Sequence, residues 1–365
     1  MIKIKRVDNV TDFYSLEKIW EDLLEECPDK HIQLSFDWCR TWLDVFGKKT
    51  ELFVLIAENG DEILGIAPLV IVKNGSFFGN SLKYRQVVFI GTGFTDRSDF
   101  IIKKHNEEII REFFSYIYQS INLWDELDLR QINTLSSNFE LIKKYSQSSL
   151  INEHKFFKVI NTPYLPIEGD FETYLSGRAK LFRKQLRMYT NNLTEDGKTL
   201  DFEVITEVKD EHINLIIEMA EYRKSLFERR NIFLEKQKFD FIQKMIPLFN
   251  KKNRIFLFFL KYEGKLLSYD FTFSYNKTVY DWNTSYNPDF KKYSVGRLLN
   301  KFIIEYCFAN GYKVYDLMAG DEDYKLKWTK VFSENYNLRV RKKNIKFSIA
   351  NYYEKVKKMV KKTNV

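Results

Sequence analysis

Hydrophobic positions divide the first half of the chain into alternating strand-like runs and helical stretches with a spacing of three to four residues. The alternating IKIKRV opens the chain, and helical patterns follow at Phe13 to Leu24 and at Phe36 to Phe46, with Ser35 as an N-cap. ELFVLIAENG and EILGIAPLVIVK, joined at Asn59-Gly60-Asp61, predict an antiparallel hairpin. A strand at RQVVFIG, a helix from Asn106 to Tyr118 and a strand at WDELDLRQI complete this half.

The second half repeats that order of patterns after a connecting strand near Phe156 to Ile160. It predicts helices at Phe182–Leu193, Glu211–Phe227, Phe239–Phe249 and Gly296–Phe308, and strands at KTLDFEVIT, RIFLFFLKYEG, KLLSYDFTFSYN, TVYDWNTSY and KVYDLMAGD. The repetition suggests a duplication, in which VLIAENGDEILGIAPLVI parallels LFFLKYEGKLLSYDFTFS. Two unrelated α/β segments remain the alternative.

Length and composition, taken together with these patterns, indicate the fold class and the number of domains. A chain of 365 residues exceeds the size at which a single core stops growing, roughly 250 to 300 residues, so two packed domains are expected. Hydrophobic residues make up 44%, with only 14 Gly and 6 Pro, which excludes disordered and low-complexity classes. We therefore expect an α/β protein with mixed α+β sheets, with domains at 1–160 and 161–338 and a basic tail at 339–365.

The net charge of +8 comes from this tail, because residues 339–365 hold ten Lys and Arg against Glu354 alone. The tail is expected to form a strand and a basic helix, which can be solvated, can bind an acidic polymer or can contact a membrane surface peripherally. Cys27, Cys39 and Cys307 and four scattered His residues form no metal or disulfide pattern. No signal peptide or membrane-length apolar stretch is readable, so a cytoplasmic protein without a metal is expected.

A helix start after the strand TVYDWNTSY is a candidate phosphate site. Ser294, Val295, Gly296 and Arg297 lie where a helix begins with a glycine close by, and free N–H groups there can bind a phosphate with help from the helix dipole. An ordinary capped helix start that binds nothing has the same spacing.

Polar residues gather again at the strand KVYDLMAGD and the segment behind it. Asp316 ends the strand, Asp321 follows in a Gly-Asp turn, and Tyr324, Lys325 and Trp328 share about one face of a short helical turn. Aromatic walls with a few charged groups suit a small-molecule substrate. A surface helix after an Asx turn is the alternative.

These motifs resemble a known family. SVGRLL, followed further along the chain by YDLMAGDEDYKLKW, is similar to the corresponding segments of bacterial GNAT acetyltransferases of the BioF2-like or CelD/BcsL type. These enzymes are related in fold to FemAB aminoacyl transferases and to Mig-14-like proteins. SFDWCRTWLDVFG with its hairpin and YLSGRAKLFRKQLRMYTNNLTEDGKTLDFEVI extend the resemblance over nearly the whole chain. Where the family usually has Ser-Pro-Gly, this chain has Ser294-Val295-Gly296.

The resemblance implies two tandem GNAT-like domains, of which the C-terminal one binds acetyl-CoA or another acyl-CoA. Val295, Gly296 and Arg297 would then contact the pyrophosphate, and splayed strands at Leu267 to Ser274 and Thr278 to Tyr286 would receive the pantetheine arm. The first half has KKHNEEIIREFF where the second has YSVGRLLNKFII, so it is expected to be a degenerate copy.

Acyl transfer needs a base for the acceptor and a proton for the leaving thiolate. Asp281 and Asp316 are the candidate bases, Tyr286 or Tyr324 the candidate proton donors, and Asp321 and Lys325 can orient the acceptor. The candidate substrate contacts are Arg183 and Arg187, on a basic helix face that can guide an anionic acceptor, together with Trp282 and Trp328. A basic face that is merely solvated is the alternative.

The expected function is transfer of an acyl group from acyl-CoA to an amine or hydroxyl of a small molecule, such as a sugar nucleotide or a cell-envelope or polysaccharide precursor. DNA is not an expected partner. Two alternatives stay open. One is FemAB-like transfer from aminoacyl-tRNA, and the other is a non-catalytic, membrane-peripheral resistance factor.

Overall fold

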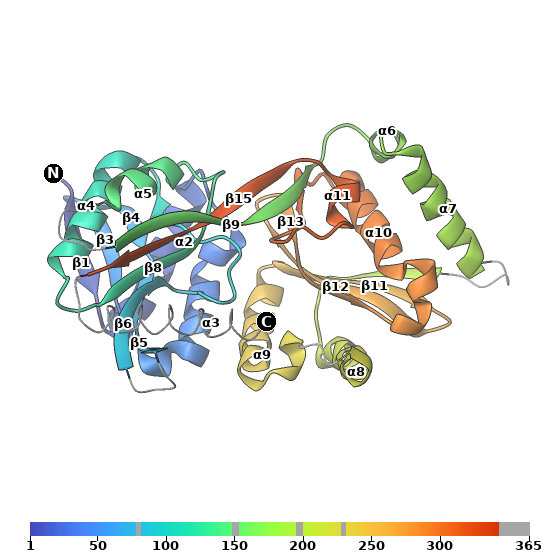
Figure 1. Cartoon of the computed structure of the whole chain (residues 1–365), viewed down its shortest axis with the longest axis horizontal. Helices are drawn as coiled ribbons and strands as arrows, with labels where there is room; N and C mark the ends of the chain where they lie inside the picture. The colour runs from blue at the N-terminus through green and yellow to red at the C-terminus, as the bar shows by residue number, and fades with distance from the viewer. Residues whose placement is uncertain (78–81, 148–152, 195–199, 228–230, 343–365) are drawn as a thin grey trace, which may run out of the picture. The chain divides into compact units, whose positions relative to one another are not determined.

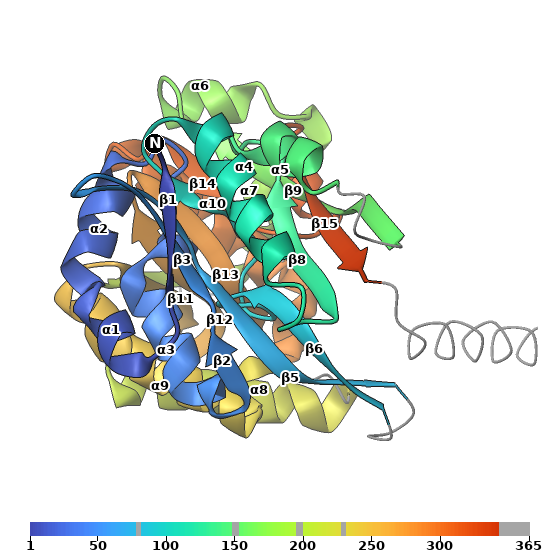
Figure 2. The ribbon, with the colours of Figure 1, turned by 90° about the vertical axis from the view of Figure 1, so that its left-hand side faces the viewer.

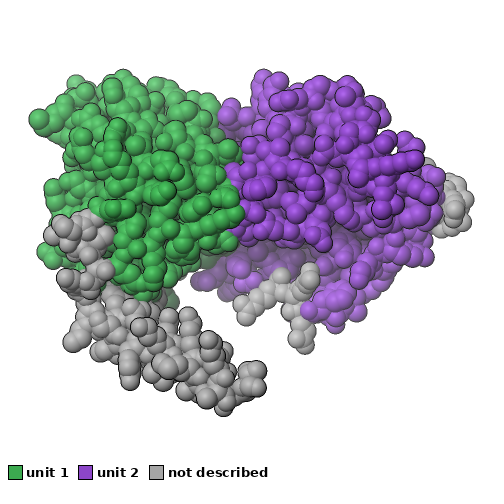
Figure 3. All heavy atoms as spheres, turned by 45° about the horizontal axis from the view of Figure 1, so that its top comes forward, with its two compact units in different colours: residues 1–159, 334–365 green, residues 160–333 purple. Residues whose placement is uncertain are grey.

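The computed structural model describes residues 1–77, 82–147, 153–194, 200–227 and 231–342. The chain forms two compact units, unit 1 with residues 1–159 and 334–365 and unit 2 with residues 160–333 (Figure 3). The predicted basic helix of the tail falls on 343–365 and lies outside the described residues. The domain boundaries 1–160, 161–338 and 339–365 remain a proposal.

Unit 1 is built from two sets of strands with helices packed on them (Figure 2). One sheet has the order β1 (Lys3–Val7), β3 (Val54–Asn59), β4 (Glu62–Ala67), β7 (Ile101–Ile102). The other set runs β2 (Thr50–Leu52), β5 (Leu69–Phe77), β6 (Leu82–Phe89), β8 (Glu126–Asn133), β15 (Phe332–Arg341). The helices are α1 (Val10–Ser15), α2 (Glu17–Glu26), α3 (Phe36–Phe46), α4 (Asn106–Gln119) and α5 (Phe139–Tyr145), with short 3-10 turns η1 (Ile32–Leu34) and η2 (Gly47–Lys49).

Most predicted elements of unit 1 are confirmed, and two are corrected. The helix predicted from Phe13 to Leu24 is two helices that meet at Leu16, where the Ser15 hydroxyl donates to the carbonyl of Asp12 at 2.7 Å. The strand predicted at EILGIAPLVIVK is broken at Pro68, which has no N–H to give to a ladder. As a result β4 pairs with β3 and β7, while β5 pairs with β2 and β6.

A buried carboxyl, Asp99, lies in the core of unit 1. It accepts hydrogen bonds from the Phe100 N–H at 2.7 Å and from the Asn138 amide at 2.9 Å, and the Ser136 hydroxyl donates to its other oxygen. Burial is the largest influence and raises the pKa of Asp99 to about 7. The folded chain therefore keeps a proton on Asp99 at pH values where the unfolded chain has lost it.

This raised pKa predicts a pH-dependent stability. The contribution of Asp99 is complete below pH about 4, the ordinary pKa of Asp, and is lost as pH rises to about 7. An Asp99→Asn variant cannot titrate there, so the difference in unfolding free energy between parent and variant should change by a few kcal/mol across this range. Urea unfolding at pH 4 to 8 measures it, and a difference that stays constant with pH would contradict the assignment.

Unit 2 is organised around the strands β10 (Leu200–Ile205), β11 (Ile255–Tyr262), β12 (Lys265–Tyr275), β13 (Thr278–Tyr286), β14 (Val314–Asp316) and the end of β9 (Glu153–Pro166), in that order. Figure 1 labels β9, β11, β12 and β13. Its helices are α6 (Phe171–Ser176), α7 (Lys180–Thr194), α8 (Asp210–Phe227), α9 (Lys236–Lys251), α10 (Val295–Ala309) and α11 (Lys325–Trp328), with 3-10 turns η3 (Ile232–Leu234) and η4 (Pro288–Tyr293). The mixed sheets confirm the predicted fold class.

The two faces of the unit 2 sheet carry different helices. Apolar side chains of α7 and α10 form one core with alternate residues of β11, such as Phe256 and Phe258. On the other face Phe249 of α9 packs edge-on against Phe273 of β12, with ring centroids 5.5 Å apart. Side chains of β12 and β13 therefore point either towards α10 or towards α9, and this alternation decides which polar groups can meet.

The order of elements in unit 2 repeats that of unit 1. In each, a strand precedes helices interrupted by a 3-10 turn, an antiparallel hairpin follows, and a helix then connects two parallel strands. That helix is α4 between β6 and β8 in unit 1, and α10 between β13 and β14 in unit 2. The predicted repetition is thus seen in the structure.

Candidate functional site

The candidate site begins where β13 and β14 diverge. These parallel strands pair only from Thr278 to Tyr280 with Val314 to Asp316, whereas β13 continues to Tyr286. The prediction of splayed strands at Leu267–Ser274 and Thr278–Tyr286 is wrong, because β12 and β13 pair over their whole common length, from Ser268 opposite Tyr286 to Tyr275 opposite Thr278. The free edge of β13 faces β14 instead, and its backbone groups are available to a ligand there.

The start of α10 follows β13 closely along the chain. Ser294 has a left-handed backbone with φ of 49°, and its side chain makes no capping hydrogen bond to the helix. The N–H of Arg297 bonds the Ser294 carbonyl at 2.8 Å, whereas the N–H groups of Val295 and Gly296 come earlier and have no acceptor within the helix. A helix of 15 residues with an uncapped start and a glycine can bind a phosphate group.

Gly296 is next to the end of β13. A Cβ atom at this position would lie 3.7 Å from the Tyr286 ring and 3.9 Å from the Ser268 hydroxyl, which are ordinary contacts. The fold therefore does not itself require glycine here. Arg223 of α8 lies 4.6 Å over the Tyr286 ring and donates to the Tyr286 carbonyl at 2.7 Å, so it fixes this end of the strand.

Arg297 points from α10 towards α7. Its guanidinium carbon lies 5.9 Å from the ring centre of Phe182 and 5.8 Å from that of Tyr189, and its Nε is buried without a hydrogen-bond partner. A cation held between aromatic rings with unused N–H donors suits an anionic ligand. The structure therefore places a positive group beside the start of α10.

Two buried carboxyls, Asp270 of β12 and Asp281 of β13, meet on the face of the sheet below α10. Asp270 is fully buried and Asp281 keeps 5% of its surface. Burial, followed by repulsion from Asp281, raises the pKa of Asp270 well above its ordinary value. Burial also raises the pKa of Asp281, while the Lys325 ammonium and the hydrogen bond from Asp270 oppose that rise. Two such neighbours cannot both ionise at low cost, so one proton is shared between them.

Tyr315 of β14 joins the two carboxyls. Its hydroxyl lies 3.3 Å from Oδ2 of Asp270 and 3.3 Å from Oδ2 of Asp281, and it accepts from the Asn300 amide of α10 at 3.1 Å. Burial raises the pKa of Tyr315 well above its ordinary value, so the phenol keeps its proton as a donor. Oδ1 of Asp270 is buried and has no hydrogen-bond partner.

Lys325 supplies a positive charge to the same cluster. Its Nζ is buried, donates to the Ala319 carbonyl at 2.8 Å and lies 3.1 Å from Glu322. The preceding Tyr324 is half-buried, and burial followed by repulsion from Asp281 raises its pKa, so it is also a phenol that keeps its proton. Asp281, Tyr324 and Lys325 were expected from sequence, and the structure brings them together.

The remaining sequence-predicted residues lie outside this cluster. Asp316 is buried and accepts from the Met318 N–H at 2.9 Å, so it holds the turn after β14. Asp321 and Arg187 are exposed, and Arg183 donates to the Arg178 carbonyl at 3.1 Å. Trp282 packs on Phe273 on the other face of the sheet, and Trp328 is fully buried against Phe182. The catalytic roles predicted for Asp316 and Asp321, and the substrate contacts predicted for the other four residues, stay predictions.

Sequence reasoning missed Asp270, Tyr315 and Asn300. The signal for Asp270 is a charged residue inside the apolar run KLLSYDFTFSY, where a buried charge is costly without partners. Tyr315 and Asn300 carry no comparable signal, because aromatic and amide residues are common on strands and helices. Their meaning depends on the contacts that the fold provides.

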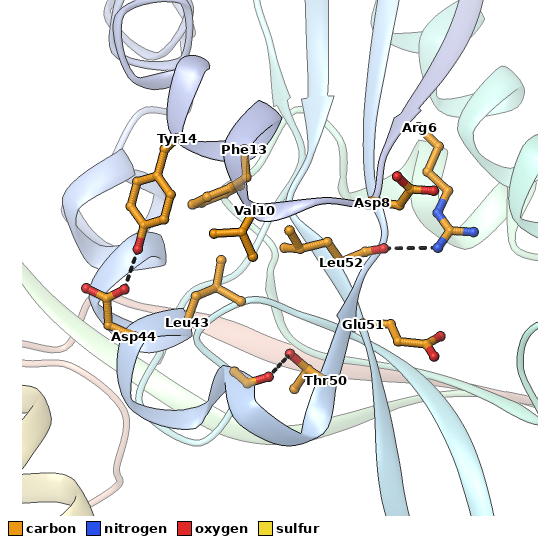
Figure 4. A pocket seen from close by; sticks show the side chains of 11 residues that line it. Arg6, Asp8, Val10, Phe13, Tyr14, Leu43, Asp44, Thr50, Glu51 and Leu52 are labelled. Carbon is orange, nitrogen blue, oxygen red and sulfur yellow. Dashed lines mark hydrogen bonds between the residues drawn. The ribbon is translucent and has the colours of Figure 1, made fainter.

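A separate pocket of about 530 Å³ lies in unit 1 (Figure 4). Arg6 lies there over the ring of Phe53 at 5.1 Å and donates to the Leu52 carbonyl at 3.2 Å, and the Tyr14 hydroxyl donates to Asp44. None of the candidate catalytic or ligand-binding residues predicted from the sequence lines this pocket. It has no buried acid pair or uncapped helix start comparable to those of unit 2.

No group of three or more His, Cys, Asp or Glu side chains is arranged to hold a metal ion in the ranges the structure describes. In the same part of the chain, no helix combines the length and the apolar character that crossing a membrane requires.

Comparison with known proteins agrees with this fold. Residues 180–326 match the family model of an acetyltransferase (GNAT) domain. This segment contains α7, the diverging strands, α10 and the cluster around Asp281. No curated protein matches the chain significantly.

Solved structures similar to this chain cover nearly its whole length. FemX has a TM-score of 0.62 at 10% identity, over 91% of this chain and 96% of FemX. The C-terminal DUF2156 domain of a putative lysylphosphatidylglycerol synthetase from Agrobacterium fabrum has a TM-score of 0.51 at 12% identity, over 92% and 95%. A tandem GNAT protein of the clavulanic acid biosynthesis pathway has a TM-score of 0.50 at 11% identity, over 93% and 98%. At these identities the likeness concerns the fold, which is that of tandem GNAT proteins.

Proposed function

We propose that this chain, an acyltransferase with a GNAT acetyltransferase domain, transfers an acyl group from acyl-CoA to an amine or hydroxyl acceptor in unit 2. The observation that carries the proposal is the position of the uncapped start of α10 at one end of the free edge of β13, with the Asp281 cluster further along it. Between Asp281 and Tyr286 the strand extends about 15 Å, at roughly 3.3 Å per residue with one bulge. A donor with a phosphate end and a reactive thioester can lie along this edge.

Each group of the site has a role in this proposal. The N–H groups of Val295 and Gly296, with Arg297, bind the pyrophosphate. Asp281 takes the proton of the acceptor as general base, and Tyr324, or alternatively Tyr286, returns a proton to the leaving thiolate. The charge of Lys325 favours the ionised form of Asp281 and so opposes the rise in pKa that burial causes.

The acceptor class is proposed from the resemblance to BioF2-like and CelD/BcsL-type enzymes rather than from the site. It would be a sugar or a cell-envelope or polysaccharide precursor. Contact of the basic tail with a membrane surface is likewise a proposal, since residues 343–365 lie outside the described residues.

Transfer from aminoacyl-tRNA is the second candidate, and the outer face of α7 favours it. Lys180, Lys184 and Arg187 are exposed there, and Lys291 and Lys292 of η4 are exposed near the same helix. A row of cations can follow a polyanionic backbone. Binding of tRNA that weakens strongly with salt, without binding of acetyl-CoA, would support this candidate against the first.

Calorimetric titration with acetyl-CoA tests the proposed donor. The parent should bind, and Gly296→Trp should bind at least about tenfold more weakly, equal to about 1.4 kcal/mol, because the indole covers the free N–H groups. Gly296→Ala is the matched control, since its Cβ makes only ordinary contacts and should change stability little. Equal binding of acetyl-CoA by the parent and by the folded Trp variant would show that the donor does not bind at the start of α10.

A further inference from the structure

The pocket of unit 1 has no part in the acyl transfer proposed for unit 2, yet it has the features of a ligand site. Its volume of about 530 Å³ lies within the usual range for small-molecule sites, about 300 to 1,000 Å³. Val10, Leu43 and Leu52 form an apolar strip across its middle (Figure 4). A small molecule with an apolar middle section fits such a lining.

Polar side chains lie at the two ends of this apolar strip. Figure 4 shows Arg6 and Asp8 at one end and Tyr14 and Asp44 at the other. Arg6 belongs to β1, and Asp8 follows the strand directly. Residues two apart in an extended chain point to the same face, so this end presents a cation and an anion next to each other.

The charge of Arg6 has no counter-ion. Its guanidinium carbon lies 5.1 Å from the ring centre of Phe53, and Nη2 donates to the Leu52 carbonyl at 3.2 Å. Its Nε is buried without a hydrogen-bond partner, and no carboxylate in the described ranges lies within ion-pair distance of it. A guanidinium held in this way suits the carboxylate of a ligand.

The other end of the pocket presents a carboxylate held by a phenol. The Tyr14 hydroxyl donates to Oδ1 of Asp44. Burial, followed by this hydrogen bond, raises the pKa of Tyr14 to about 12, so the phenol stays a donor. Arg40 lies close enough to oppose that rise, but its own charge is paired with Glu17 at 3.6 Å. Asp44 is thus oriented towards the pocket without a cation of its own.

The unpaired charges of the pocket can now be counted. Among the described residues, Asp8 and Asp44 have no cationic partner, whereas Glu51, the third carboxylate of the lining, is paired with Lys73 at 2.5 Å. Together with Arg6, this leaves two negative charges and one positive charge. A complementary ligand carries two positive charges and one negative charge.

We infer that this pocket binds a diamino carboxylic acid of the lysine or ornithine type. Arg6 holds its carboxylate, and Asp8 holds the ammonium group on the same carbon atom, since the two side chains are adjacent. The methylene groups of the ligand lie on the apolar strip, as the stems of lysine side chains do on protein surfaces. The terminal ammonium group reaches Asp44.

Other classes of ligand fit this charge pattern less well. A diamine leaves Arg6 without a partner and sets an ammonium group beside it. An aliphatic amino acid leaves Asp44 without a partner, and a polyphosphate is repelled by both carboxylates. Asp8 and Asp44 are exposed, so each ionic contact is partly screened by water and modest affinity is expected.

Calorimetric titration of the full chain with lysine and three analogues tests the inference. Each analogue lacks one charged group: norleucine the terminal ammonium, cadaverine the carboxylate and 6-aminohexanoate the α-ammonium. Lysine should bind with a dissociation constant of about 1 mM or tighter, and each analogue at least about tenfold more weakly at the same ionic strength. No binding of lysine at about 10 mM, or equal binding of lysine and any analogue, would overturn the inference.

Two variants assign the contacts within the pocket. Asp44→Asn should weaken lysine binding at least about tenfold and leave norleucine unchanged, whereas Arg6→Leu should weaken lysine and leave cadaverine unchanged. Asp22→Asn, at an exposed position of α2 outside the pocket lining, is the control and should bind like the parent. Variants that weaken all ligands equally, or none, would overturn these contacts.

The analogue series on the parent still decides the inference should Arg6→Leu not fold. The site does not depend on the acyl transfer proposed for unit 2, so a failure of either leaves the other intact.

Discussion

Replacing Asp281 by Asn should lower the rate of acyl transfer by about 10² to 10⁴, the usual contribution of a positioned general base. The amide has the shape of the carboxylate and can still contact Tyr315, but it cannot take a proton from the acceptor. Binding of acetyl-CoA should be little changed, because the proposed phosphate contacts are at the start of α10, away from Asp281. Steady-state rates and calorimetry on the same preparations measure both quantities.

Asp201→Asn is the matched control for this substitution. Asp201 is exposed on β10 and carries no proposed role, so its variant should keep the rate of the parent. An Asp281→Asn variant that is folded, binds acetyl-CoA and transfers at the parental rate would show that the base lies elsewhere in the site.

Replacing Trp328 by Ala should destabilise the protein by about 3 to 5 kcal/mol, the usual cost of deleting a large core aromatic side chain. The indole is fully buried and meets Phe182 edge-on, with ring centroids 4.8 Å apart. The Trp328 carbonyl, which accepts from Tyr174 at 2.6 Å, is backbone and survives the substitution. Urea unfolding of the variant and the parent gives the difference in free energy.

Leu181→Ala is the control for this core assignment. Leu181 is the chain neighbour of Phe182 but is 68% exposed, so its loss should change stability by no more than about 0.5 kcal/mol. A Trp328→Ala variant as stable as the parent, but with weaker substrate binding, would support the ligand contact predicted from sequence instead.

Local patterns were sufficient to predict most elements of the fold. The hairpin of β11 and β12 and the helix α10 follow from alternation and from a 3.6-residue period, which are properties of neighbouring residues. The break at Pro68 could also be predicted from the sequence, because proline has no backbone N–H to donate to a neighbouring strand. Its effect, two strands that join different sheets, depends on partners distant in sequence.

The candidate site was predicted only in part, for the same physical reason. Asp281 and Lys325 could be singled out because charged residues near expected strand ends and after turns suggest chemistry, although the structure places Asp281 within β13. Asp270 becomes significant only through the register that sets β12 beside β13, and Tyr315 only through the parallel pairing of β14 with β13. The position of the free strand edge was predicted wrongly, because two strands joined by a hairpin turn have the same hydrophobic pattern whether they stay paired or diverge.

Hydrogen–deuterium exchange of the full chain with and without acetyl-CoA tests the location of the donor site most directly. Acetyl-CoA should slow exchange in residues 281–297, which include the free edge of β13 and the start of α10, and should leave residues 6–52 around the unit 1 pocket unchanged. Slower exchange confined to residues 6–52, or no change in residues 281–297 at saturating acetyl-CoA, would contradict a donor site in unit 2.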